Sequence, residues 1–147
     1  MACKASGVLL ATIMAGLCAS FASGAETDPH VDLRQGQAAA IPVSVVDGRV
    51  LLGPARLGKL GSLEAKPGEI VVGLAAGDRK TLLAPIAATE RTSVPIDFVA
   101  SGMIGEIKID ERVLCGRLDG PVTGHIGSVA WKVTLHEFTV GKGGACD

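Results

Sequence analysis

The chain has 147 residues, a formal net charge of −1, and 48% hydrophobic but only 3% aromatic residues. Basic and acidic residues are balanced, at 14 against 15, without a basic cluster, which disfavours nucleic-acid binding because that depends on neutralising phosphates. The absence of Asn excludes N-glycosylation, and the scarcity of aromatic side chains argues against ligand recognition by stacking.

Residues 1–25 have the composition of a secretory signal peptide. Lys4 supplies a positive charge, residues 8–21 form an apolar core, and Ser23 and Ala25 are small residues where a signal peptidase reads. The core is shorter than the roughly 20 residues of a spanning helix. We therefore expect an exported protein, periplasmic or extracellular, with no membrane span in the mature chain. The alternatives are a retained anchor and lipidation at Cys18.

Residues 26–37 are polar and show no sustained period, which predicts a flexible N-terminal arm or a loosely attached edge. A single β domain is expected over residues 38–147. Its first element is a hairpin, because residues 41–46 and 49–52 flank an Asp-Gly pair that tolerates the positive φ angles of a type I′ turn.

Residues 69–76 form a continuous apolar run that is typical of a buried strand. Gly77 and Asp78 follow it and precede residues 79–84. This order predicts a second hairpin with a two-residue type II′ turn.

The next segments also favour short strands. Residues 93–100 have strand character, and residues 106–110 alternate charged side chains with Ile107 and Ile109, which predicts a solvated strand face. Residues 119–127 are rich in glycine and are expected to form a connection between strands.

Residues 128–140 predict the central strand of the domain. From residue 129 to 135 the apolar side chains occupy odd positions, and this places Trp131 at the centre of the core. At His136 and Glu137 the apolar side chains move to even positions, and such a shift indicates a β-bulge.

The four cysteines reduce to Cys115 and Cys146 once the signal peptide is removed. An even pair in an exported chain predicts a disulfide. It would tie the C-terminal tail to the sheet. A redox-active pair, the alternative, would prefer a Cys-x-x-Cys spacing.

Together these elements predict an all-β fold, an antiparallel β-sandwich or small barrel of about seven to nine short strands with one disulfide. Recurring prolines between the apolar runs favour short strands over long helices.

No catalytic residue is identified from the sequence, and no cofactor is expected. His136 and Glu137 begin a His-Glu-x-x-His zinc motif, but Val140 stands where the second histidine is needed. The candidate metal ligands are His30, Asp32, His125, His136 and Glu137, and the candidate binding residues in the glycine-rich connection are Asp119, Thr123 and His125.

These features favour a non-catalytic exported β-domain that binds another macromolecule, as an envelope interaction module, assembly factor or inhibitor. Such a domain would bind a protein or another envelope component by edge-strand addition or through its loops. One alternative is a small metal-dependent or hydrolytic enzyme that draws on His125, His136, Glu137, Asp110 or Asp119. A second alternative is a structural subunit of a surface assembly, in which residues 26–37 donate a strand to a neighbour.

Overall fold

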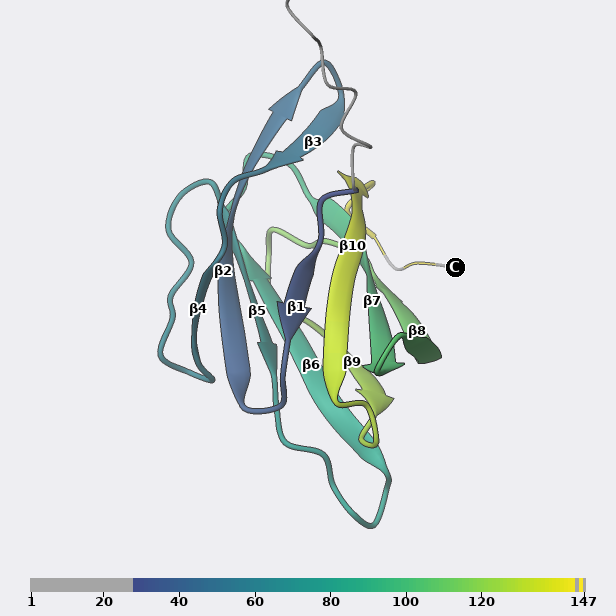
Figure 1. The fold of residues 1–147 in the computed structure, drawn as a ribbon. Helices are drawn as coiled ribbons and strands as arrows, with labels where there is room; N and C mark the ends of the chain where they lie inside the picture. Colours follow the sequence, from purple (N-terminus) through teal and green to yellow (C-terminus); the bar gives the residue numbers. More distant parts are fainter. Residues whose placement is uncertain (1–27, 145, 147) are drawn as a thin grey trace, which may run out of the picture.

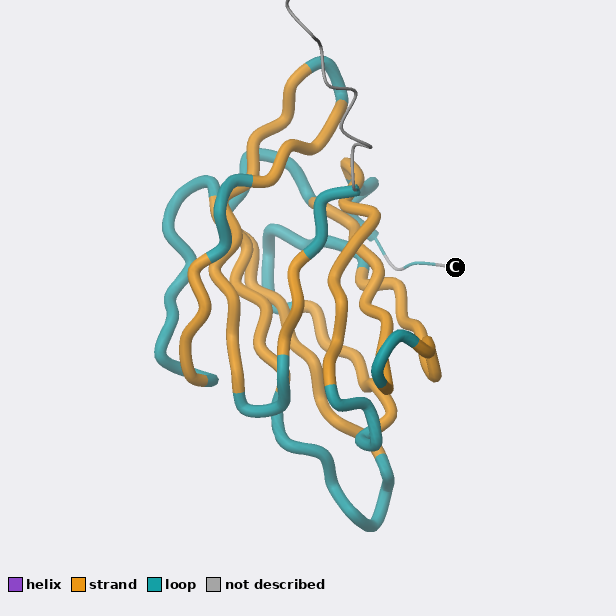
Figure 2. The backbone as a smooth tube through the Cα atoms, viewed as in Figure 1, coloured by secondary structure: helices purple, strands orange, loops and turns teal. Residues whose placement is uncertain are grey.

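The computed structural model describes residues 28–144 and 146, and these residues form ten strands and no helix (Figures 1 and 2). The strands make two antiparallel sheets, which confirms the predicted all-β fold with slightly more strands than expected. The expected signal peptide, residues 1–25, lies outside the described residues. In the described part of the chain, no helix has the length and apolar character needed to cross a bilayer.

The first sheet has four strands and the second has six. The four-stranded sheet has the order β1 (Val31–Leu33), β10 (Lys132–Val140), β7 (Ile96–Ile104) and β8 (Ile107–Leu114). The other sheet has the order β3 (Arg49–Leu52), β2 (Gln37–Val46), β5 (Glu69–Leu74), β6 (Leu83–Glu90) and β9 (Val122–Gly127), and β4 (Arg56–Lys59) also pairs with β2.

The core fills the space between the two sheets. In β6 the buried residues Ala84, Ile86 and Ala88 alternate with exposed ones, as expected for a strand with one solvated face. Phe98 on β7 stacks on Phe138 on β10 with ring centroids 5.4 Å apart. Burial of each large apolar side chain contributes roughly 1.5–3 kcal/mol of transfer free energy.

The first predicted hairpin is confirmed. β2 and β3 pair from Val43 opposite Leu52 to Val46 opposite Arg49, and the turn residue between them, Asp47, has a φ of 51°.

In the second predicted hairpin the first strand is right, but both the turn and the second strand are wrong, because residues 79–82 are turn and β6 begins at Leu83. β5 pairs with β6, but residues 75–82 connect them in place of a two-residue turn at Gly77 and Asp78. In this loop Gly77 lies against Ser128 of another connection, which leaves no room for a side chain at position 77. The far end of the loop closes on itself, where Leu82 N donates to Asp78 O at 2.8 Å.

Trp131 does not lie in the core, contrary to the prediction, and its side chain is 74% exposed. Residues 128–131 form a turn and bend, and β10 begins only at Lys132. Ala130 takes the buried position before the strand, while the predicted alternation holds for Val133 and Leu135.

The glycine-rich segment 119–127 is also corrected by the structure. Most of it is strand β9, which pairs with β6 from Val122 opposite Ala88 to Gly127 opposite Leu83. The glycines of this segment therefore did not indicate a loop, since Gly120 precedes the strand while Gly124 and Gly127 lie within it.

Within residues 26–37, expected as a flexible arm or a loosely attached edge, Val31–Leu33 forms edge strand β1 on β10. Leu33 is fully buried in the core. At the other terminus, Cys115 and Cys146 form the predicted disulfide, with Cα atoms 5.7 Å apart. Such a bond persists in oxidising compartments, in keeping with export.

Candidate functional site

The β2–β3 hairpin projects beyond the rest of the sandwich as a two-stranded ribbon, at the top of Figure 1. The first part of β2 pairs with β5 as far as Pro42 opposite Glu69, whereas residues 43–46 pair with β3. Among the described residues, no strand pairs with the outer edge of β3 or with residues 44–46 on the β5 side. The ribbon therefore presents unpaired backbone on both edges.

The hydrogen-bond pattern of the ribbon identifies the groups on its outer edge. Gly53 N donates to Pro42 O at 2.8 Å, so this pair bonds across the ribbon. Because bonded and non-bonded pairs alternate in an antiparallel ladder, Val50 and Leu52 direct their N–H and C=O groups away from β2. These groups are available to another strand.

Three apolar side chains on the ribbon, Val45, Val46 and Leu51, are exposed. Val46 and Leu51 lie on one face of the ribbon. Val45 lies on the other face near the turn, where Val43, Val50 and Leu52 pack against the core. The ribbon is thus held rigidly at its base while its outer side chains meet solvent. Long apolar edges are uncommon in soluble proteins because they invite pairing with other chains.

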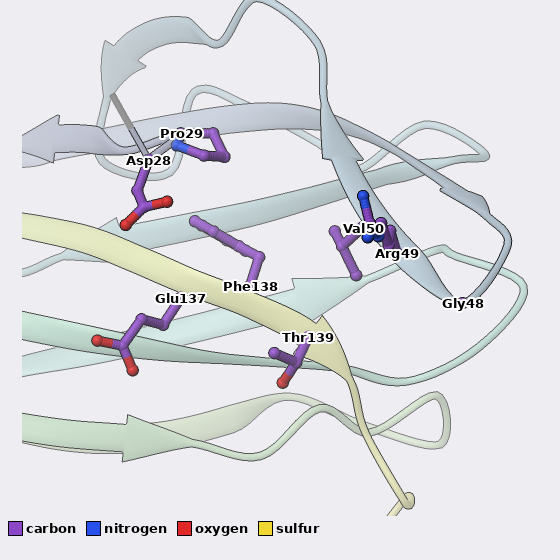
Figure 3. A pocket seen from close by; sticks show the side chains of 8 residues that line it. All are labelled: Asp28, Pro29, Gly48, Arg49, Val50, Glu137, Phe138 and Thr139. Carbon is purple, nitrogen blue, oxygen red and sulfur yellow. The ribbon is translucent and has the colours of Figure 1, made fainter. Parts of the chain in front are cut away.

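A cavity of about 370 Å³ lies in the angle between the ribbon and β10 (Figure 3). Phe138 projects between Pro29 and Val50 and provides an apolar wall. Arg49 and Glu137 place opposite charges at its rim. The cavity could therefore accept an apolar side chain that is flanked by polar groups.

The β-bulge predicted at His136 and Glu137 is confirmed, because the β7–β10 register shifts between His136 and Thr139. Glu137 has a φ of 53°, a conformation that non-glycine residues seldom adopt. The bulge turns Phe138 into the core and Glu137 outward, so it forms the β10 side of the cavity.

His136 belongs to a hydrogen-bonded cluster on the outer face of the four-stranded sheet. Its Nε2 lies 2.7 Å from Ser101 Oγ, and its Nδ1 lies 3.3 Å from Glu137 Oε1. The order of hydroxyl, imidazole and carboxylate resembles that of a catalytic triad. Ser101 Oγ, however, also donates to Glu111 Oε2 at 3.1 Å.

That second bond decides the chemistry of the cluster. A hydroxyl has one proton, so a Ser101 that donates to Glu111 must accept from His136 Nε2–H. His136 then cannot remove the proton of Ser101. The pKa of Glu111 is held below its usual value, first by the bond from Lys108 and then by the bond from Ser101, so Glu111 remains a charged acceptor. We interpret the cluster as a structural network between strands.

The other predicted metal ligands are dispersed. Asp32 accepts from Thr134 Oγ1 at 2.7 Å and from Lys132 Nζ at 3.1 Å. Burial would raise the pKa of Asp32, but these two bonds outweigh it and lower the pKa. The one hydrogen bond of the His30 ring among the described residues joins Nδ1 to Asp28 O at 3.2 Å. Among residues 28–144 and 146, no three His, Cys, Asp or Glu side chains are placed to hold one metal ion.

The predicted binding residues do not form one site. Thr123 and His125 lie on β9, and both are exposed. Asp119 lies in the preceding connection and forms a loose ion pair with Arg117 at 3.7 Å. Thr123 lines a shallow cavity beside the disulfide, and His125 and Asp119 do not.

The residues of the ribbon were missed as a site. The type I′ signal at Asp47 predicted the hairpin, but not that β5 begins too late to cover the end of β2. The apolar runs at 38–46 and 69–76 have nearly the same length, so the sequence contains no signal of the offset between the two strands. The offset itself is a tertiary feature.

Comparisons with protein-family models, with curated proteins and with solved structures find no match for this chain.

Proposed function

We propose that the protein is a non-catalytic exported β-domain, periplasmic or secreted, that binds another protein by strand addition to the β2–β3 ribbon. The observation that carries this proposal is the ribbon itself, with unpaired backbone on its edges and three exposed apolar side chains. Strand addition obtains affinity from main-chain hydrogen bonds and specificity from pockets for alternate side chains.

The ribbon and its cavity fit the two parts of that recognition mode. An extended segment beside β3 would bond to Val50 and Leu52, and one of its side chains would reach the cavity lined by Phe138. Arg49 and Glu137 at the rim favour a segment with polar residues flanking an apolar one.

The opposite open side of the sandwich is less suited to pairing. Asp110 on β8 accepts from Gly127 N at 3.0 Å, and Arg112 donates to His125 O at 3.2 Å. Side chains of β8 thus already occupy outward-facing backbone groups of β9. This contrast favours the ribbon as the edge that a partner uses.

The enzymatic alternative has less support. Of the five residues that it draws on, only His136 and Glu137 line a common cavity. The proton arrangement at Ser101 further disfavours a nucleophile activated by His136.

The test is capture from the native envelope by the purified protein and by three variants. Val50→Pro removes an N–H from the outer edge of β3 without removing a bond of the ribbon. Val46→Lys places a charge on the apolar surface, and Leu118→Lys is its matched control, since Val46 is 51% exposed and Leu118 is 50% exposed elsewhere.

We expect the wild-type protein and Leu118→Lys to retain a common partner, and the two ribbon variants to lose at least about tenfold in its recovery. Equal recovery by all four proteins would reject the proposal. Sedimentation of the purified protein completes the test. A dimer that Val50→Pro abolishes would identify the partner as a second copy, as the structural-subunit alternative requires.

A further inference from the structure

Four connections meet at the end of the sandwich opposite the ribbon, at the bottom of Figure 1. They are residues 34–36, 75–82, 105–106 and 128–131, and we call them the connection end. Gln35 ties three of them together. Its Nε2 donates to Ser128 O at 2.7 Å, and its Oε1 accepts from Gly77 N at 2.9 Å. The connection end is therefore preorganised.

Large apolar side chains are exposed at the connection end. They are Leu82, Val129 and Trp131, with Ile107 at the first position of β8, and Trp131 is the most exposed large apolar residue among those described. In the turn that carries Val129 and Trp131, the buried position is occupied by Ala130. The two larger side chains therefore do not contribute to the core.

Leu82 is presented to solvent in a conformation that costs free energy. Its φ is 56°, a left-handed value that is unfavourable for a bulky side chain, and its side chain is 59% exposed. Two backbone bonds hold it there, from Leu82 N to Asp78 O and from Ser128 N to Leu82 O at 2.9 Å. Strain that is maintained at an exposed apolar residue points to a role in binding.

Two cations lie beside Trp131. A cavity of about 450 Å³ is lined by Trp131, Gly105, Arg34 and Lys132, with no carboxylate among them. Among the described residues Arg34 forms no ion pair, whereas Lys132 is paired with Asp32.

Further charges lie on the connections themselves. Arg79 and Lys80 precede Leu82, and the acids on the same connections are Asp78 and Glu106. The four connections thus carry three cations, Arg34, Arg79 and Lys80, against two acids, an excess of one positive charge.

From this combination we infer that the connection end docks on a bilayer surface that carries anionic phospholipid headgroups. Indole side chains favour the boundary between headgroups and acyl chains, and Arg and Lys are attracted to anionic lipid. Docking at this end leaves the ribbon, at the other end, accessible to its partner.

The exposed apolar side chains come from separate connections and from the start of β8, and of the four only Trp131 lines the cavity described above. A bilayer accepts such a shape without needing a complementary surface, whereas a protein partner would need one. Apolar side chains beside cations are also typical of protein segments that insert shallowly into the membrane interface.

The test uses sedimentation with vesicles of phosphatidylcholine alone and of phosphatidylcholine with phosphatidylglycerol. Trp131 is the sole tryptophan, so its emission reports directly on insertion. We expect binding only to the anionic vesicles, with a blue shift of the emission. Raising NaCl from about 0.1 M to about 0.5 M should weaken binding at least about tenfold, because it screens the headgroup charge.

The variants separate binding from folding. Leu82→Asn removes the apolar side chain while Asn tolerates the left-handed conformation, so it should weaken vesicle binding about tenfold without loss of thermal stability. Arg34→Gln should weaken binding about fivefold. Leu118→Gln, an exposed apolar position elsewhere, and Val46→Lys on the ribbon should bind as the wild type does.

Absence of binding to anionic vesicles would overturn the inference. So would unchanged binding by Leu82→Asn, or an identical emission shift with inorganic phosphate alone, since the last would indicate a site for a soluble anion. None of these results bears on the ribbon. Loss of partner capture by Val46→Lys with vesicle binding intact would show that the two surfaces act independently.

Discussion

Glu90 at the end of β6 is a buried carboxyl group whose replacement should make the protein more stable at neutral and alkaline pH. Its residue is only 6% exposed. One carboxylate oxygen, Oε2, accepts from Ile96 N at 3.2 Å, and the other, Oε1, has no hydrogen-bond partner among the described residues. The backbone at Gly116 lies against the same oxygen, so the site is closely packed.

Burial is the main cause that raises the pKa of Glu90 from its ordinary 4.5 to about 7. The bond from Ile96 N opposes the shift, and the nearby Asp97 carboxylate adds to it. Between these two pH values the folded protein binds one proton more than the unfolded chain. The free energy of unfolding must therefore fall as pH rises through this window.

The size of the effect follows from the shift. At about 1.4 kcal/mol per pH unit, a shift from 4.5 to about 7 corresponds to roughly 3 kcal/mol. This contribution is fully present below pH 4.5 and is lost above about pH 7. Glu90→Gln has nearly the same shape and no charge, so it should equal the wild type near pH 4 and exceed it by up to about 3 kcal/mol at pH 8.

Urea unfolding at a series of pH values, with the disulfide intact, measures this difference. Carboxylates that lose their native bonds in acid, such as Asp32, affect both proteins equally and cancel. Glu64→Gln, at an exposed position, is the control and should differ from the wild type by the same small amount at every pH. A Glu90→Gln difference that does not change with pH, or a wild type that is the more stable at pH 8, would refute the reasoning.

Three further predictions concern stability and are measured by the same unfolding experiment. Trp131→Ala should lower the free energy of unfolding by less than about 1 kcal/mol, because its side chain is mostly in solvent; a loss above about 3 kcal/mol, typical of a core aromatic, would contradict the structure. Gly116→Ala should cost at least about 2 kcal/mol, since the added Cβ would overlap the backbone of Ile96; a neutral effect would mean that this loop yields. Reduction of the Cys115–Cys146 bond, which spans 31 residues, should lower stability by about 3 kcal/mol, and an unchanged midpoint would show that the bond contributes nothing.

Features set by local chemistry could be predicted from the sequence. The turn at Asp47 could be predicted from an adjacent Asp-Gly pair that tolerates positive φ angles. The bulge at His136 could be predicted because the apolar side chains move there from odd to even positions. The Cys115–Cys146 bond was predicted from the expected export and from an even number of cysteines. In each case a few neighbouring residues, or a simple count, settled the outcome.

Features that depend on where a strand begins could not be predicted from the sequence. Trp131 shares the parity of Val133 and Leu135, and alternation alone places all three on one side. The regular strand begins only at Lys132. Residues 128–130 turn before it, and Trp131 N donates to Met103 O at 2.9 Å. Periodicity does not show at which residue a strand begins. Trp131 lies one residue before β10, and its side chain is therefore exposed instead of buried.

Both proposed surfaces consist of residues that tertiary structure brings together or leaves uncovered. The ribbon is a candidate site because β5 starts at Glu69 and leaves the end of β2 without a neighbour on that side. The connection end is a candidate site because Gln35 joins segments that are more than 90 residues apart in sequence. Each contains apolar side chains that sequence patterning assigns to a core. The core is already filled, largely by alanine, leucine, isoleucine, valine and phenylalanine. The exposed apolar side chains are therefore not needed for the core, and this supports a role for them in binding.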